Sequence, residues 1–333
     1  MAIRIRVGLV GAAVCLAMCV SGAVAAAPQE ARPPANDDCL ACHGDASLKR
    51  DDGRSLAVDA KHFEGSRHGP MACVDCHADL AKAELPHEPK LARVQCASCH
   101  DEIGGKYRDS IHAWAKEKAG LTTAAPSCAS CHGAHDVKAH TDKTSRVFRD
   151  QVPATCGSCH AGIREQYDRG IHAAALKNGG APVCVDCHTT HAIQRVDTDR
   201  WRLSITAECG TCHAGVIDSF RRTFHGKVTE LGFTRVAACA DCHGAHTILP
   251  ASNPASTVSK ARLVDTCGRC HQGANERFAK YDPHPNPRDY KRSAVLWWAN
   301  RFYWVLIPGI FGFFGLHSLL WFRRSMKDRE RRS

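Results

Sequence analysis

The pentad Cys-x-x-Cys-His occurs nine times in this chain of 333 residues and contains eighteen of its twenty cysteines. Two thiols at this spacing can each form a thioether with one vinyl group of a haem, and the adjacent histidine can bind the iron from one side. The nine copies therefore predict nine covalently bound haem c groups. The cysteines predicted to attach them are Cys39, Cys42, Cys73, Cys76, Cys96, Cys99, Cys128, Cys131, Cys156, Cys159, Cys184, Cys187, Cys209, Cys212, Cys239, Cys242, Cys267 and Cys270. The predicted proximal iron ligands are His43, His77, His100, His132, His160, His188, His213, His243 and His271.

Other uses of the cysteines explain the pentads less well. Zinc sites also use paired cysteines, but zinc chemistry does not require a histidine directly after every second one. A disulfide framework would not place its cysteines in one repeated local pattern. The two remaining cysteines, Cys15 and Cys19, lie in an N-terminal apolar stretch that we expect to be removed. The mature chain would then keep no cysteine for a disulfide, an iron–sulfur cluster or a nucleophile.

Residues 1–25 have the three parts of a secretory signal peptide. Arg4 and Arg6 form a short positive region, residues 7–20 are weakly apolar, and Ala23-Val24-Ala25 is an A-x-A cleavage site. We expect cleavage after Ala25, and the alternative is an uncleaved N-terminal anchor. In both cases the following residues are exported to the periplasm, the bacterial compartment in which haem c is attached.

A second apolar segment, residues 302–322, contains no charged residue and is predicted to cross the bilayer as a helix. About 20 apolar residues are enough for one span. Tryptophan and tyrosine side chains flank the segment, as in an interfacial aromatic belt, and residues 323–333 form a basic tail that the positive-inside rule keeps in the cytoplasm. Residues 291–301 are expected to be a juxtamembrane segment. A buried core helix is the alternative interpretation of residues 302–322.

The formal charge of +10 is concentrated at the two ends of the chain. Residues 1–25 carry two basic side chains and no acidic one, and residues 291–333 carry nine basic and two acidic side chains. Residues 26–290 are left with a net charge of +1. The basicity therefore reflects membrane topology and not nucleic-acid binding. Two propionates on each haem would make the loaded domain acidic, which favours a basic periplasmic redox partner.

A repeat of about 53 to 60 residues organises residues 26–290. From His100, His160 and His213, an aromatic residue follows at +7 and a free histidine at +12. A second pentad comes next, and another histidine stands three residues after it. Apolar residues at i, i+4 and i+8 between the motifs predict a short helix with the free histidine at its end. The fold class expected is a mostly irregular, short α-helical multihaem domain of duplicated two-haem repeats, plus one C-terminal transmembrane helix.

Twelve histidines lie outside the pentads, and nine of them are predicted to be distal iron ligands. Imidazole suits iron, and nine irons need nine sixth ligands. A histidine three residues after a proximal one cannot reach the opposite face of the same haem, so it should bind the iron of a neighbouring haem. The predicted distal ligands are His68, His87, His112, His135, His172, His191, His225, His246 and His284. His62 and His140 remain as surface residues in reserve.

A full set of distal histidines would leave no iron with an open position, which predicts an electron-transfer protein and not an enzyme. The alternative is a multihaem reductase of a small nitrogen or sulfur oxyanion with one open haem. Such reductases usually mark the active haem with an unusual proximal ligand such as the lysine of CxxCK, and this motif is absent from the sequence. Storage of electrons is a third, weaker interpretation. A candidate methionine ligand is also scarce, because Met71 is the only methionine between residues 26 and 290.

The chain resembles multihaem c-type cytochromes of the class III and NapC/NirT-like group. It looks more like the nine-haem periplasmic cytochromes that work beside a membrane-embedded dihaem b-type cytochrome. The resemblance covers residues 39 to about 322 and depends on the pentads, the SIH and GIH segments at His112 and His172, the CHGAH segments at 131–135 and 242–246, and the tail from DPHP (His284) to FFGLH (His317).

This resemblance implies that the chain passes electrons between a quinone-reactive membrane subunit, such as a b-type cytochrome, and periplasmic acceptors. The expected location is the bacterial inner membrane, with the haem domain in the periplasm. NapC/NirT proteins are typically anchored at the N-terminus and carry fewer haems, so direct quinol oxidation by this chain is not implied. His317 lies inside the predicted span. Because intramembrane ionisable groups are often functional, it could contact a haem or quinone of a partner, or bond to a neighbouring helix.

Overall fold

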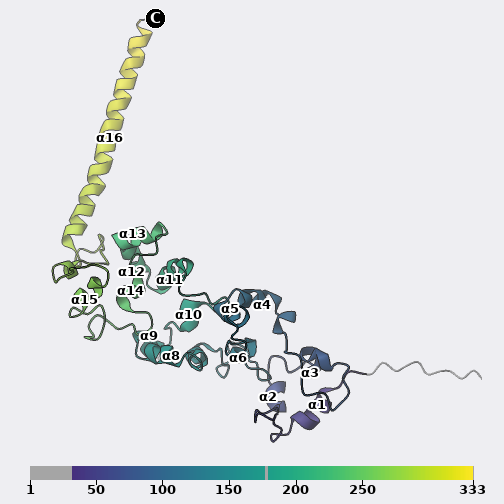
Figure 1. The fold of residues 1–333 in the computed structure, drawn as a ribbon. Helices are drawn as coiled ribbons and strands as arrows, with labels where there is room; N and C mark the ends of the chain where they lie inside the picture. The colour runs from purple at the N-terminus through teal and green to yellow at the C-terminus, as the bar shows by residue number, and fades with distance from the viewer. Residues whose placement is uncertain (1–31, 177–178, 333) are drawn as a thin grey trace, which may run out of the picture.

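The computed structural model describes residues 32–176 and 179–332 as a series of short helices that runs away from one long C-terminal helix (Figure 1). The predicted signal peptide, with Cys15 and Cys19, lies outside the described residues. Within those residues there is no β-strand, and the only bridge joins Lys49 and Ser55. The fold is therefore the short-helical domain with one long apolar C-terminal helix that the sequence predicted.

The helices are between three and fourteen residues long, except for the last one. In chain order they are α1 (Asn36–His43), α2 (Ala60–Glu64), α3 (Cys73–Cys76), η1 (Ala78–Leu80), η2 (Cys96–Ser98), α4 (Asp101–Arg108), α5 (Ile111–Glu117), α6 (Cys128–His132), η3 (Arg149–Gln151), α7 (Val152–Gly157), α8 (Ala161–Asp168), α9 (Ile171–Leu176), α10 (Cys184–His188), α11 (Asp199–Cys212), α12 (Ala214–Arg221), α13 (Phe224–Glu230), α14 (Cys239–His243), α15 (Leu263–Gly268), η4 (Phe278–Lys280) and α16 (Ala294–Glu330).

Several pentads begin their own helical turn because an acidic residue inside the pentad caps it. The carboxylates of Asp75, Asp186 and Asp241 accept hydrogen bonds from the backbone N–H of the residue before the first cysteine, at 2.8, 2.6 and 2.8 Å. This N–H has no partner within a helix, and a negative charge is favourable at a helix N-terminus. One helical turn places the two cysteines, three residues apart, on the same side.

The segment after the third, fifth and seventh pentads differs from the single helix that the apolar spacing predicted. It is split into two helices, and the free histidine lies in the first turn of the second one, as His112 does in α5. The break occurs where Ser110 and Thr223 act as N-caps, with side-chain oxygens that accept the N–H of Ala113 and Gly226 at 3.1 Å. Ser and Thr favour this position over a helix interior, which the apolar periodicity alone does not reveal.

The polypeptide supplies only a small apolar core of its own. The buried apolar residues among those described are Ala113, Val152, Tyr167, Ala181, Val183, Trp201, Ile217 and Phe220. The accessible surface of the chain is 26005 Å², about twice the roughly 13,000 Å² of a compact monomer of this mass. Burial of protein side chains alone therefore cannot offset the conformational entropy lost on folding.

Backbone hydrogen bonds join successive repeats end to end. In each case the residue just before a free histidine donates its N–H to a carbonyl two residues after another free histidine. These inter-repeat bonds are Arg67 to Val137 at 2.8 Å, Ile111 to Ile193 at 2.7 Å and Ile171 to Ile248 at 2.8 Å. The repeats are thus stacked units in which each one contacts its neighbours.

Helix α16 contains 37 residues and spans about 55 Å at the usual rise of an α-helix. It begins at Ala294 and ends at Glu330, so the predicted span of residues 302–322 is the apolar middle of a longer helix. Most of the predicted juxtamembrane segment and basic tail belong to the same helix as the predicted span. None of its residues is buried, so it is not the core helix of the alternative interpretation.

The small core predicts that the haem-free chain is largely unfolded. The full chain, produced where haem is not attached, should show little near-ultraviolet circular dichroism and rapid proteolysis, because the cofactors must supply most of the apolar interior. The haem-loaded chain is the control. A haem-free preparation with native near-ultraviolet dichroism and protease resistance would contradict this expectation.

Candidate functional site

Each of the nine pentad histidines faces one histidine from outside the pentads. The centroids of the paired rings lie between 5.9 and 6.4 Å apart. The pairs are His43–His87, His77–His135, His100–His68, His132–His191, His160–His112, His188–His246, His213–His172, His243–His284 and His271–His225. The nine partners are the same nine residues that the sequence predicted as distal ligands.

This separation fits one metal ion between two imidazoles. A metal–imidazole bond of about 2.0 Å on each side places the two ring centroids roughly 6 Å apart. Among the described residues no cluster of three or more His, Cys, Asp or Glu could hold a bare metal ion. Two axial imidazoles with two nearby thiols instead match a planar cofactor that brings its own equatorial ligands, and haem c is such a cofactor.

Hydrogen bonds orient several of these rings for metal binding. The Nδ1 atoms of His43 and His87 donate to the carbonyls of Leu56 and Glu88, both at 2.8 Å, which leaves the Nε2 lone pair of each ring free. His284 is held by Ser219, whose hydroxyl donates to the carbonyl of Val216 and accepts from Nδ1 at 3.2 Å. Such outer contacts fix the tautomer and the ring angle of metal-binding histidines.

Burial favours the neutral form of many of the paired histidines. It lowers the pKa of His112 and His172, and the facing rings of His160 and His213 lower the pKa further, because two nearby imidazolium charges would repel each other. The pKa values of His132, His135, His188, His191, His225, His243, His246 and His284 are lowered for the same main reason. A neutral imidazole is the form that binds a metal.

Seven of the nine pairs join positions two pentads apart, and the exceptions are His43–His87 and His243–His284. The histidines three residues after an even-numbered pentad, His135, His191 and His246, face the proximal histidine two pentads earlier in the chain. The histidines at +12, located in α5, α9 and α13, face the proximal histidine two pentads later. The sequence predicted a neighbouring haem for the first set without identifying it. Each repeat therefore contributes side chains to the sites of the repeats on both sides.

Consecutive pentads also lie next to one another in space. The thiols of first cysteines lie close enough in pairs for one to raise the pKa of the other, and the pairs are Cys39–Cys73, Cys96–Cys128, Cys156–Cys184 and Cys209–Cys239. The other consecutive pentads are also close to each other, because a thiol of one raises the pKa of a thiol of the other. These thiol pairs are Cys76–Cys99, Cys131–Cys159, Cys187–Cys209 and Cys242–Cys267. The spatial order of the nine pentads is therefore their order in the sequence.

Two arginines outside the predicted site residues link one pentad to the next in the second and third repeats. Arg149 donates to both carboxylate oxygens of Asp186, at 3.1 and 2.8 Å, and Arg202 donates to Asp241 at 3.1 Å. Each arginine lies seven residues before the first cysteine of one pentad, and each aspartate is the third residue of the following pentad. Alignment of the repeats would have revealed this pattern.

The tyrosines at +7 fix the loop before the next pentad. The hydroxyls of Tyr107 and Tyr167 donate to the carbonyls of Pro126 and Pro182, at 2.5 and 2.9 Å. In the third repeat this position is Phe220, which is buried without a hydroxyl. A further contact that was not foreseen is the ring of Trp201, which stacks on His188 with centroids 4.9 Å apart.

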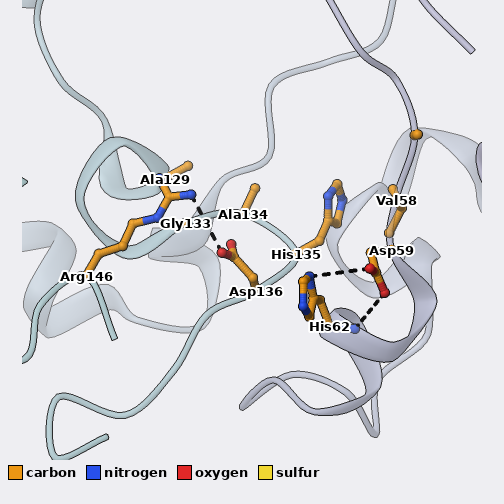
Figure 2. Close-up of a pocket in the computed structure, with 10 residues that line it drawn as sticks. Val58, Asp59, His62, Ala129, Gly133, Ala134, His135, Asp136 and Arg146 are labelled. Atoms are coloured by element: carbon orange, nitrogen blue, oxygen red, sulfur yellow. Dashed lines mark hydrogen bonds and ion pairs between the residues drawn. The ribbon is translucent and has the colours of Figure 1, made fainter. Parts of the chain in front are cut away.

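In the part of the chain that the structure describes, three histidines outside the pentads face no proximal ring. His62 and His140 are exposed, and His62 lies 3.5 Å from the carboxylate of Asp59. Figure 2 shows that His62 and His135 line the same cavity of about 320 Å³, opposite the ion pair of Arg146 and Asp136. This cavity leaves room beside the ring of His135, the partner of His77. His317 is an exposed residue of α16.

Comparison with known proteins relates the chain to one class. No family model matches it, and no solved structure matches it. The sequence is 25% identical to the high-molecular-weight cytochrome c of Nitratidesulfovibrio vulgaris (strain Hildenborough), in an alignment that covers 78% of this chain and 50% of that protein. The chain is a distant homologue of a multihaem c-type cytochrome. It spans about half the length of this relative, so activities of the whole relative are not transferred to it.

The hydroxyl of Tyr167 should stabilise the haem-loaded protein. Tyr167→Phe removes the donor to the Pro182 carbonyl, so we expect a loss of about 1 kcal/mol of unfolding free energy. Denaturant titration followed by haem absorbance measures this change. Tyr281→Phe, at an exposed position, is the matched control and should be neutral. Equal effects of the two substitutions would show that the hydrogen bond does not contribute.

Proposed function

We propose that this chain is a membrane-anchored periplasmic nonahaem c-type cytochrome that carries electrons between a membrane quinone or cytochrome b partner and periplasmic acceptors. The observation that carries the proposal is the set of nine facing histidine pairs, one for each pentad. The distant relationship to a multihaem cytochrome c supports electron transfer in general. The number of haems, the anchor and the partners are parts of the proposal.

The cysteines and the two kinds of histidine have different roles at each proposed haem site. In each pentad the two cysteines would hold a haem covalently, and the proximal histidine and its facing partner would bind the iron. When bound, haem supplies an iron that takes up and releases one electron. Because the fold holds both imidazoles in place, the two side chains would need little rearrangement when an electron is transferred. Bis-histidine ligation also favours lower potentials than a histidine–methionine pair.

The spatial arrangement supports a role in transport over a distance. Because consecutive pentads adjoin, a haem held by each one would lie beside the next. Figure 1 shows the first pentad, in α1, at the end of the domain opposite α16 and the last pentad, in α15, close to the base of α16. The nine sites would therefore form a path from the membrane to the outer end of the domain. A reductase with one open haem is supported less well, since every proximal ring has a facing imidazole.

The haem content and spin state of the purified chain test this proposal. Mass spectrometry and haemochrome spectra should give nine haems per chain, and all of them should be low-spin and six-coordinate in electron paramagnetic resonance spectra. A five-coordinate, high-spin haem in the native protein would favour the reductase alternative. Fewer than nine haems would contradict the assignment of one haem to each pentad.

Removal of one distal histidine should open one site. His191→Ala takes away the imidazole that faces His132, so we expect one haem in nine to become high-spin while the others stay low-spin. Absorption and electron paramagnetic resonance spectra provide the measurement. His62→Ala removes an exposed histidine that faces no proximal ring and should leave all haems low-spin. A high-spin haem in His62→Ala, but not in His191→Ala, would show that His62 and not His191 is the distal ligand.

A further inference from the structure

The third repeat ends in an edge that no further repeat covers. In the first two repeats the N–H groups of Ile111 and Ile171 bond to the carbonyls of Ile193 and Ile248 in the next repeat. The equivalent residue of the third repeat is Phe224, and among the described residues its N–H makes no corresponding bond. Its side chain is 76% exposed. Terminal repeats of stacked proteins normally present a polar outer face to water.

This edge is both apolar and basic. We call it the α13 patch and define it by Phe224, Leu231, Phe233, Arg221, Arg222, Lys227 and Arg235. Leu231 and Phe233 are 86% and 53% exposed. Glu230 is the only acidic residue between 221 and 235, and it pairs with Arg221 at 3.4 Å and Lys227 at 3.2 Å. Exposed aromatic and leucine side chains beside basic groups are typical of surfaces that lie in a membrane interface.

The patch lies on the side of the domain from which the membrane helix leaves. In Figure 1, α13 and the base of α16 both lie at the upper edge of the domain. One contact connects α12, which precedes α13, to the segment that leads into α16: Ser219 bonds to His284 at 3.2 Å. Within that segment Asp282 binds Arg292 through hydrogen bonds of 2.7 and 2.8 Å.

Basic residues outnumber acidic ones at the end of the domain next to α16, and acidic residues outnumber basic ones at the opposite end. Residues 214–293, next to α16, contain twelve basic and seven acidic residues, whereas residues 36–95, at the opposite end, contain eight basic and eleven acidic residues. Bilayers that contain anionic phospholipids attract basic segments close to the membrane. Although two propionates on each haem would make the loaded domain as a whole acidic, the basic side chains of the α13 patch itself are complementary to the anionic surface that the anchor brings next to it.

We propose that the α13 patch rests on the anionic phospholipid surface beside α16. Phe224, Leu231 and Phe233 insert among the headgroups, and the basic side chains contact lipid phosphates. The inference rests on the proposed function to the extent that α16 must cross the bilayer. Because His225 of α13 faces His271, the contact would hold the ninth haem site at the membrane surface, where a quinone-reactive partner is embedded.

Hydroxyl-radical footprinting of the haem-loaded full chain tests this contact. The chain is placed in nanodiscs with anionic lipid, in nanodiscs with zwitterionic lipid only, and in detergent. We expect the oxidation rates of Leu231 and Phe233 to fall several-fold in anionic nanodiscs, and less in zwitterionic ones. Leu121, which is 51% exposed and follows Gly120 as Phe233 follows Gly232, is the internal control and should react equally in all three.

Substitutions separate insertion from a nonspecific effect of the nanodisc. The double variant Leu231→Glu with Phe233→Glu should lose the lipid-dependent protection of Phe224, and Leu121→Glu should keep it. High salt should weaken the protection, since the charge attraction is screened. Neither variant alters a histidine or cysteine assigned to a haem, so haem absorbance should be unchanged.

Two outcomes would overturn the proposal. Equal oxidation of Leu231 and Phe233 in all three environments would show that the patch faces water, and protection that arises only when a membrane protein partner is added would assign the patch to that protein. Haem counting on the same samples is independent of the footprint. Nine low-spin haems with an unprotected patch would refute the contact alone, whereas a wrong haem count would refute the proposed function.

Discussion

The distance between facing imidazoles is the constraint on which the rest of the structure depends. In each of the nine pairs, the centroids of the two imidazole rings lie about 6 Å apart. This separation is suited to one metal ion between the two rings. Because a proximal histidine and its partner lie more than thirty residues apart in the sequence, each pair acts as a cross-link along the chain. The short helices, the inter-repeat hydrogen bonds and the order of the pentads are all consistent with these cross-links.

The paired histidines also explain how the chain can fold with so few buried apolar side chains. A few buried side chains, such as Val183 and Trp201, could not order about three hundred residues. An apolar cofactor at each pair would supply the missing interior, and metal binding would contribute folding free energy directly. The same architecture suits transport of electrons, since a chain that folds around closely spaced cofactors brings those cofactors close to one another. Stability and electron transfer would then depend on the same contacts.

The sequence predicted local features better than long-range ones. The nine pentads, the long apolar C-terminal helix and the nine histidines that face proximal rings were all identified without coordinates. The prediction of one helix between motifs was wrong, because Ser110 and Thr223 cap a second helix. The expected apolar stripe was also only partly correct, since Phe220 is buried while Val216 and Phe224 are exposed. Arg149 and Arg202 were missed because their aspartate partners lie more than thirty residues away.

The sequence by itself determined which chemistry the chain can support and how many pentads it has, because two cysteines and the following histidine are encoded within five consecutive residues. It also determined that one end is apolar enough to cross a membrane. Only the tertiary structure decided which histidines face each other, that seven of the nine partners are two pentads apart, and that the pentads adjoin in sequence order. Ring pairing depends on the relative positions of separate repeats, and no local pattern of residues contains that information. The exposed edge at α13 was likewise visible only after the repeats had been placed side by side.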